Sequence, residues 1–348
     1  MRLVDRVAQC RTPFIAICRS TGLQTRLAGA MDFADDAAKC PIRYVLSDEL
    51  TRLCAALAYS KGAQSLACTD LVRIPAERLW VEWAYAPWRN ELDRYGFPPS
   101  NDQFDNCGRR GALLMASRDG RRGHVKTFWC TGEADIDVSV SPMYADFDFD
   151  APERDNHQTA QSHALRVMNG PSDSDSTIKT CFSFNFEPTW AEYYDRAQLS
   201  AAHRQVLEHH SLGTVALDIP VILAFFLLLN TRAGLPQQKS RLERLNKSRI
   251  RGGKAPLLDH IDVLAPFPSG YLSTRGDSES SGRRRPRLHH VRGHLVRRRN
   301  ELFWRVPHLR GNSSAGVLKT RTVTWAFDQP QGRTTRQPTG PATEPISA

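Results

Sequence analysis

The sequence predicts an α+β protein: an antiparallel sheet region, then a helical middle, then a small basic C-terminal β module. Three observations predict this order. Several strand-like segments follow one another between residues 74 and 154, helical patterns fill residues 178–265, and short alternating segments rich in Arg and His fill residues 283–327. Residues 1–73 form a partly helical N-terminal region, within which residues 1–45 have too weak a periodicity for a prediction. We expect residues 328–348, rich in Pro, Thr and Gly, to be disordered.

Composition bounds the class of protein. The 348 residues suffice for two domains or one large domain, and 41% of them are hydrophobic, enough for a buried core. The longest apolar run, Val221–Leu229, has nine residues and is too short to span a bilayer, so we expect a core helix and no membrane partner. The N-terminal residues do not resemble a signal peptide. The eight cysteines are scattered without CxxC spacing, which favours a reducing cytoplasm over a disulfide framework.

The first predicted helix is Ser47–Ala58. Ser47 suits the N-cap position, and Leu50, Cys54 and Leu57 recur on one helical face. The strand-like segments that follow are the aromatic stretch ending at Trp83, then Gly111–Ser117, Val125–Cys130, Glu133–Val140 and Tyr144–Asp150. Several short strands in succession predict an antiparallel sheet.

Two of these segments carry carboxylates at every second position. The two sets are Glu133, Asp135 and Asp137, and Asp146, Asp148 and Asp150. Clustered oxygen ligands suit a divalent metal ion. The same pattern is also typical of a solvated strand face protected by charge. Nothing in the sequence brings the two sets together, so we favour the solvated face and predict no metal or other cofactor.

The helical middle is predicted as two helices. The first covers Trp190–Leu207 and is opened by Thr189, and the second covers about Ile219–Asn230, with Asp218 as its N-cap and Pro220 in its first turn. The stretch Leu235–Lys254 is basic, with seven Lys and Arg residues and one acid from residue 239 onward. It is either a basic surface helix that contacts phosphates or an ordinary solvated helix.

The positive charge of the protein is concentrated between Arg283 and Thr324. This segment has twelve Lys and Arg residues and one acid, Glu301, a net charge of +11 against +10 for the whole chain. Everything outside the segment therefore sums to −1. Its pattern predicts three strands, Leu288–Arg298, Leu302–His308 and Gly316–Trp325, the first two forming a hairpin, with a Gly- and Ser-rich break at residues 311–314 before the third.

Alternation in these strands predicts a cationic face. His290, Arg292 and His294 share one side of the first strand, and Lys319 and Arg321 share one side of the last. The candidate nucleic-acid-binding residues are His290, Arg292, His294, Arg297, Arg298, Arg305, His308, Arg310, Lys319 and Arg321. Such a sheet packs one side on a core and shows cations on the other.

Several of these segments occur in a familiar order. They are the stretch Ile74–Trp83, then Arg110–Leu114, Leu229–Arg232 and Gly253–His260, followed by the HHVRGH…RVPHLRG segment. Over about residues 74–324 the chain resembles a group of uncharacterised tailed-phage and prophage proteins of Gram-negative bacteria. The resemblance implies a phage origin and a location in the host cytoplasm. It assigns no catalytic or binding residue.

The histidines and arginines of the basic segment leave several functions open. A metal site is disfavoured by the surrounding positive charge. A nuclease would use His as acid and base and Arg to stabilise charge on phosphorus, and its catalytic residues stay unknown. A non-catalytic nucleic-acid-binding surface, to DNA or RNA, needs only cations at suitable spacing, and we favour it. A third possibility is an inhibitor or adaptor that binds an acidic host protein. No GxSxG, HExxH, phosphate-loop or dinucleotide motif is present.

Overall fold

The computed structural model describes residues 1–10, 15–18, 23–26, 30–59, 69–95, 108–130, 138–150, 181–188, 190, 192, 195, 198, 200–232, 234–266, 287–291, 294–298, 301–305, 308–310 and 312–317. Contacts divide the chain into two units, Met1–Ser269 with His294–Val306, and Gly270–Gly293 with Pro307–Ala348. The predicted disordered tail, residues 328–348, lies outside the described residues.

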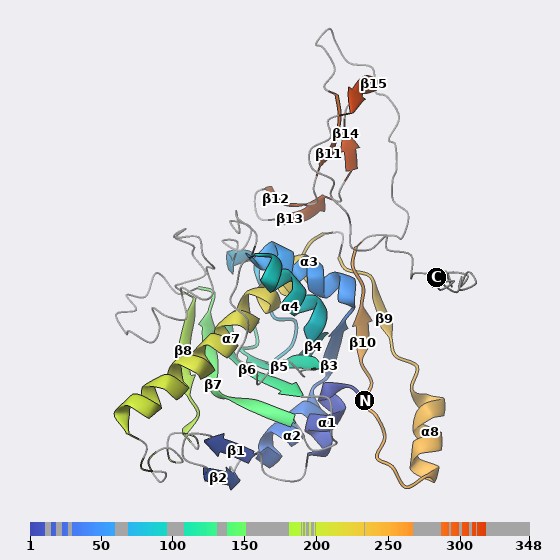
Figure 1. Ribbon diagram of the computed structural model, residues 1–348. Coiled ribbons are helices and arrows are strands. Elements are labelled where there is room, and N and C mark those ends of the chain that lie inside the picture. The colour runs from blue at the N-terminus through green and yellow to red at the C-terminus, as the bar shows by residue number, and fades with distance from the viewer. Residues whose placement is uncertain are drawn as a thin grey trace, which may run out of the picture. The chain divides into compact units, whose positions relative to one another are not determined.

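The first unit is built on a mixed sheet that has eight strands within the described residues (Figure 1). Their order across the sheet is β8 (Phe182–Phe186), β7 (Val138–Asp148), β6 (Arg122–Cys130), β5 (Arg109–Ala116), β4 (Arg78–Ala84), β3 (Ile42–Leu46), β10 (Ile261–Val263) and β9 (Gln237–Lys239). From β4 to β8 every neighbouring pair is antiparallel, while β3 runs parallel to β4 and to β10. The predicted α+β fold with an antiparallel sheet region is confirmed.

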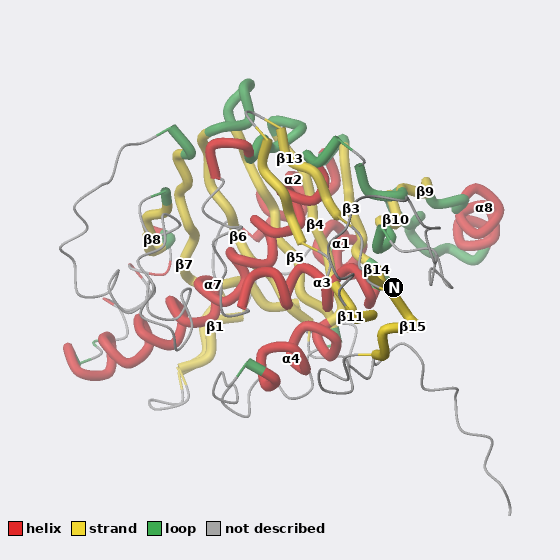
Figure 2. Tube along the Cα trace, turned by 90° about the horizontal axis from the view of Figure 1, so that it is seen from above, coloured by secondary structure: helices red, strands yellow, loops and turns green. Residues whose placement is uncertain are grey.

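Helices cover both faces of this sheet. On one face α3 (Asp48–Tyr59), α4 (Tyr85–Arg94) and α7 (Ala201–Leu229) pack into the larger hydrophobic core, and Figure 2 shows them together. On the other face α1 (Leu3–Gln9) packs with α2 (Ala30–Lys39) over a smaller core around Trp80 and Phe128. A 3₁₀ turn (Thr69–Leu71) precedes β4, and β1 (Ile15–Cys18) pairs with β2 (Leu23–Arg26).

The Ser47 helix and most predicted strands are confirmed. Ser47 Oγ accepts the amide of Leu50 at 3.2 Å at the start of α3, and Leu50 and Cys54 are buried. The two strands predicted on either side of Pro142 are instead one strand, β7. The register shifts between the pairs Lys126–Tyr144 and Phe128–Val140, over the part of β7 that contains Pro142. Such an irregularity accommodates a proline, which has no amide hydrogen for the ladder.

The helical middle differs from its prediction. In place of a helix that starts after Asp218, α7 runs without a break from Ala201 to Leu229, with Pro220 in its interior. A proline inside a helix costs about 3 kcal/mol. Burial of each large side chain between Val221 and Leu228 stabilises the fold by roughly 1.5–3 kcal/mol. Together these contributions exceed the cost of the proline. The predicted core helix at Val221–Leu229 is confirmed.

Part of α7 also resembles a membrane span. Among the described residues, Ser211–Leu229 is the one segment long and apolar enough to cross a bilayer, and 82% of it is buried inside the protein. The thiols of Cys10, Cys40, Cys54, Cys130 and Cys181 form no disulfide within the described part of the chain.

Asp218 is a buried partner of the sheet rather than a helix cap. Its side chain is fully buried, and Oδ2 accepts a hydrogen bond from Arg110 Nη2 at 2.7 Å. The Arg110 guanidinium lies 4.9 Å from the ring centroid of Trp88. Burial raises the pKa of the Asp218 carboxyl, an effect that Arg110 opposes. This pair joins the centre of α7 to β5.

The N-terminal helix is fixed by a carboxylate from the middle of the sheet. Glu82 is fully buried on β4. Its two oxygens each accept a hydrogen bond at 2.9 Å, one from the amide of Leu3 and one from the amide of Val4. The first amides of a helix have no partner within it, so a carboxylate suits this position. Arg109 forms an ion pair with the same carboxylate. The chain start is therefore part of the core.

Candidate nucleic-acid interface

The basic C-terminal segment is divided between the two units. β12 (His294–Arg298) pairs with β13 (Glu301–Arg305) and belongs to the first unit, whereas β11 (Arg287–Val291), β14 (His308–Arg310) and β15 (Asn312–Val317) belong to the second. The strand predicted over Leu288–Arg298 is therefore two strands, separated at residues 292–293, which the structure leaves undescribed. Arg292 is one of these, so the face it was predicted to share with its neighbours stays a prediction.

One side of the β12–β13 hairpin is anchored in the first unit. Leu302 is buried in the larger core, and Leu295 and Trp304 pack against it. Arg297, on the same side, donates to Asp70 through both terminal nitrogens, at 3.1 and 2.7 Å. Arg297 was predicted to contact nucleic acid, but its guanidinium is held by this carboxylate.

The end of α7 also holds the hairpin. The amide of Arg232 donates to the carbonyl oxygen of Leu302 at 3.1 Å, and Arg232 Nη1 lies 3.7 Å from Glu301 Oε2. A polar cavity of about 540 Å³ lies beside these contacts and is lined by Asp70, Leu71, Arg73, Asn230, Arg232, Glu301 and Leu302. Its two arginines face two carboxylates, so its formal charge is balanced.

The other side of the hairpin carries the remaining cations. The register sets His294 opposite Arg305, Val296 opposite Phe303 and Arg298 opposite Glu301. Because directly opposed residues in an antiparallel pair share a face, these six lie on one side, away from Leu302. His294, Arg298 and Arg305 are exposed. This outer face of β12–β13 thus retains three of the predicted binding residues.

The second unit holds the others that are described. β11 pairs antiparallel with β14, setting His289 opposite Arg310, His290 opposite Leu309 and Val291 opposite His308. β11 also pairs parallel with β15 (Asn312–Val317), which begins inside the break predicted at residues 311–314. Lys319 and Arg321 lie outside the described residues.

The second basic stretch is a surface helix. α8 (Glu243–Arg251) lies between β9 and β10 in the chain, and it stands beyond the β9 edge of the sheet in both Figure 1 and Figure 2. None of its residues is buried. Two apolar residues of α8, Leu245 and Ile250, are 48% and 60% exposed. Gly253, with φ of 68°, takes the left-handed conformation that ends the helix.

Hydrogen bonds fix which side of α8 faces the protein. Asn246 accepts the amide of Leu257 at 2.8 Å and donates to its carbonyl at 2.9 Å, and Arg249 Nε donates to the carbonyl of Ala255 at 2.9 Å. With 3.6 residues per turn, positions 244, 247 and 251 fall on the opposite side. Arg244, Lys247 and Arg251 therefore form an exposed row. No described residue forms an ion pair with any of the three.

The alternating carboxylates of β7 are engaged with other residues. Asp146 Oδ2 accepts from Asn185 at 2.6 Å, Asp148 pairs with Arg122 at 3.3 Å, and Asp150 pairs with Arg121 at 2.7 Å. Within the described chain no three His, Cys, Asp or Glu residues form a group suited to a metal ion. The other set, Glu133, Asp135 and Asp137, lies outside the described residues.

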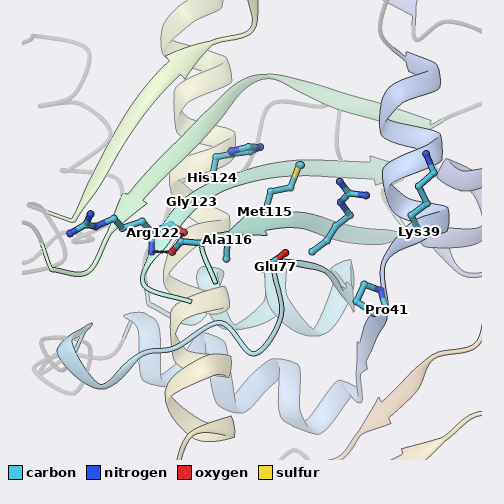
Figure 3. A pocket seen from close by; sticks show the side chains of 10 residues that line it. Lys39, Pro41, Glu77, Met115, Ala116, Arg122, Gly123 and His124 are labelled. Atoms are coloured by element: carbon cyan, nitrogen blue, oxygen red, sulfur yellow. Dashed lines mark hydrogen bonds between the residues drawn. The ribbon is translucent and has the colours of Figure 1, made fainter. Parts of the chain in front are cut away.

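The sequence did not point to a cavity beside β5 and β6, two inner strands of the main sheet. It has a volume of about 830 Å³ and lies between the end of α2 and the β5–β6 turn, lined by Lys39, Pro41, Glu77, Arg78, Met115, Ala116, Ser117, Arg122, Gly123 and His124. Figure 3 shows Lys39 at one end and Arg122 at the other. Each of its three cations has a carboxylate, Asp35, Asp36 or Asp148, within 3.8 Å. The balanced charge makes this cavity a poorer phosphate site than α8.

A buried lysine lies on the same face of the sheet as this cavity. Lys126 forms an ion pair with Glu187 and lies 5.4 Å from the ring of Phe33. Burial lowers the pKa of Lys126 to about 8, and Glu187 opposes the shift. Lys126 does not line the cavity. The available sequence signal was a lysine within the predicted strand Val125–Cys130, most of whose other residues are apolar.

Comparisons with known proteins name no family. No family model, no curated protein and no solved structure matches the chain. The resemblance to phage and prophage proteins noted from the sequence stays a prediction. The residues themselves must therefore carry any statement of function.

Proposed function

We propose that this protein binds nucleic acid through contacts to phosphates, made by α8 and by the outer face of β12–β13. The observation that carries the proposal is the row of Arg244, Lys247 and Arg251, which is exposed and has no ion-pair partner within the described chain. Like charges held on one helix face repel one another and are stabilised by a polyanion. A phosphate backbone supplies such a polyanion.

The geometry of the row fits a phosphate backbone. Positions 244 and 251 are separated by seven residues, or about 10 Å along a helix that rises 1.5 Å per residue. Duplex DNA carries about one phosphate per 1.7 Å of helix axis when both strands are counted, so a row of this length is long enough to lie beside several phosphates. Lysine and arginine suit this role because they donate several hydrogen bonds to phosphate oxygens.

The segment that carries α8 is held on the first unit at several points. The amide of Leu258 donates to Asp5 Oδ1 at 2.7 Å, and Arg2 Nη2 lies 3.2 Å from Asp262 Oδ1. Arg43 Nη1 donates to the carbonyl of Asp259 at 3.3 Å. These contacts fix the helix before any ligand arrives, which reduces the ordering entropy that binding must overcome.

Two cations of the predicted interface support the proposal from a different surface. Arg298 and Arg305 are exposed on the outer face of β12–β13 and form no ion pair among the described residues. The one acid of that face, Glu301, lies 3.7 Å from Arg232. As part of this proposal, the protein is of phage origin and acts in the host cytoplasm, as the resemblance implies.

A second candidate function is a His/Arg nuclease. The observation that favours it is the cross-strand pair His294 and Arg305, both exposed and directly opposite each other. Such a pair supplies a proton-transfer group beside a fixed positive charge.

The test is direct binding of fluorescent DNA and RNA oligonucleotides at low salt, followed by anisotropy. We expect binding by the wild type, loss of most affinity in the Arg244→Glu, Lys247→Glu, Arg251→Glu triple variant, and little competition from polyglutamate. Competition by polyglutamate as strong as that by DNA would favour an acidic protein partner instead. Cleaved oligonucleotide on a gel, abolished by His294→Ala while binding survives, would establish the nuclease. No binding by the wild type would refute the proposal.

A further inference from the structure

The outer face of β12–β13 has an aromatic ring at its centre. Phe303 lies opposite Val296, and both are half-buried. The core below the hairpin is contacted by Leu295, Leu302 and Trp304 from the other side and by neither of these two residues. Alternation along the strands thus turns Phe303 away from the packed interior.

Cations lie on both sides of this ring. Arg305 is two residues along the same strand, roughly 7 Å away at a rise of 3.4 Å per residue, and Arg298 lies two residues beyond Val296 in the other direction. His294 completes the pair with Arg305. An aromatic side chain between cations is the arrangement by which proteins stack an unpaired base and hold the phosphates on either side of it.

We infer that the outer face of β12–β13 binds single-stranded nucleic acid by stacking a base on Phe303, with Arg298 and Arg305 contacting the adjoining phosphates. The inference rests on the proposed function and names the ligand of one of its two surfaces. Bases within a duplex are stacked on one another and do not present a free face to a side chain. The surface therefore selects unpaired nucleotides, whereas the α8 row contacts phosphates of either form.

The hairpin is fixed firmly enough to serve as a stacking surface. Its inner side is held by the buried Leu302, by the two hydrogen bonds from Arg297 to Asp70, and by the bond from the Arg232 amide to Leu302. Removing the Phe303 ring changes the outer side only. The substitution is therefore expected to leave the fold intact.

The test compares Phe303→Ala, Phe303→Leu and Phe303→Tyr in the full chain, with a thymidine 12-mer and a duplex of the same length as probes. Stacking of one base is worth about 1–3 kcal/mol, which corresponds to a loss of about 5-fold to 150-fold in affinity for the single strand. We expect this loss in the Ala and Leu variants, wild-type affinity in the Tyr variant, and less than about a 2-fold change for the duplex. Leu264→Ala, at an exposed apolar residue elsewhere, should change neither affinity.

Equal losses for single strand and duplex, or no loss for either, would overturn the stacking inference. If duplex binding still depends on Arg244, Lys247 and Arg251 in that case, the proposed function stands and only the ligand of the hairpin is wrong. If the wild type binds neither probe, both proposals fail. Melting temperatures of the variants within a few degrees of the wild type confirm that the fold is unchanged.

Discussion

Individual residues of this protein owe their roles to partners far away in sequence. Arg297 and Asp70 are 227 positions apart and form two hydrogen bonds. Asp218 is an acceptable N-cap by its local sequence, yet its carboxylate pairs with Arg110 inside the core. The location of the positive charge was predicted from the sequence. Which cations remain available for a ligand was not, because that depends on where carboxylates from distant segments come to lie.

Lys126 gives a prediction at this scale. With its pKa at about 8 in the folded protein and near 10.5 in the unfolded chain, Lys126 keeps its proton longer when unfolded. Between these two pH values the unfolded state binds more protons, so the contribution of Lys126 to stability rises with pH. Below pH 8 its buried charge is most unfavourable. The unfolding free energy of Lys126→Met relative to that of the wild type should therefore be highest at neutral pH.

Urea unfolding at pH 7, 9 and 10.5 measures this. The difference in unfolding free energy between Lys126→Met and wild type should shrink by on the order of 3 kcal/mol across that range, at 1.36 kcal/mol per pKa unit. Tyrosine and cysteine titrations occur in both proteins and cancel in the difference. A difference that stays constant with pH would mean that Lys126 is not buried as a charge.

At the scale of elements, local patterns predicted those segments that carry their own signal. Ser47 and the spacing of Leu50 and Cys54 predicted α3, and short strand-like segments in succession predicted β4, β5 and β6. β9 and β10 have three residues each, too few to show a strand pattern in the sequence, and they are defined by the strands that they pair with. Pro220 was read as a helix start because local rules place proline there. In the structure the helix begins earlier, at Ala201, because burial of the residues after Pro220 compensates for a proline in its interior.

The two helices α7 and α8 give a paired prediction at this scale. Phe225 on α7 is fully buried, whereas Leu245 on α8 is 48% exposed. Phe225→Asp places an unpaired charge in the core and should cost several kcal/mol, leaving little soluble protein. Leu245→Asp changes a solvated position and should shift the melting temperature by at most a few degrees. Soluble yield and thermal melting measure both, and normal folding of Phe225→Asp would contradict the placement of α7 in the core.

At the scale of the whole molecule, the regions distinguished in the sequence share one structure. The predicted regions 1–73, 74–154 and 178–265 all contribute strands to the main sheet. The basic segment, predicted as one β module over residues 283–327, contributes its hairpin β12–β13 to the first unit and its other strands to the second. Differences in composition distinguished these regions in the sequence. The order of the strands depends on pairing between distant segments, which cannot be predicted from the residues of one segment alone.

We propose that α8 contacts phosphates because of where its charges lie and not because of net charge alone. Two triple alanine variants remove the same charge. One replaces Arg244, Lys247 and Arg251, and the control replaces the ion-paired surface cations Lys39, Arg122 and Arg204. Both lower the net charge by three. They differ in where the lost cations lie and in whether those cations had carboxylate partners.

The measurement that tests this most directly is the slope of log K against log salt concentration for binding to a DNA duplex. Each phosphate contact contributes about 0.9 to the magnitude of that slope. The α8 variant should therefore lose about 2.7 from it, while the control variant keeps a slope close to that of the wild type. An α8 variant with the wild-type slope, or two variants with equal losses, would contradict the account.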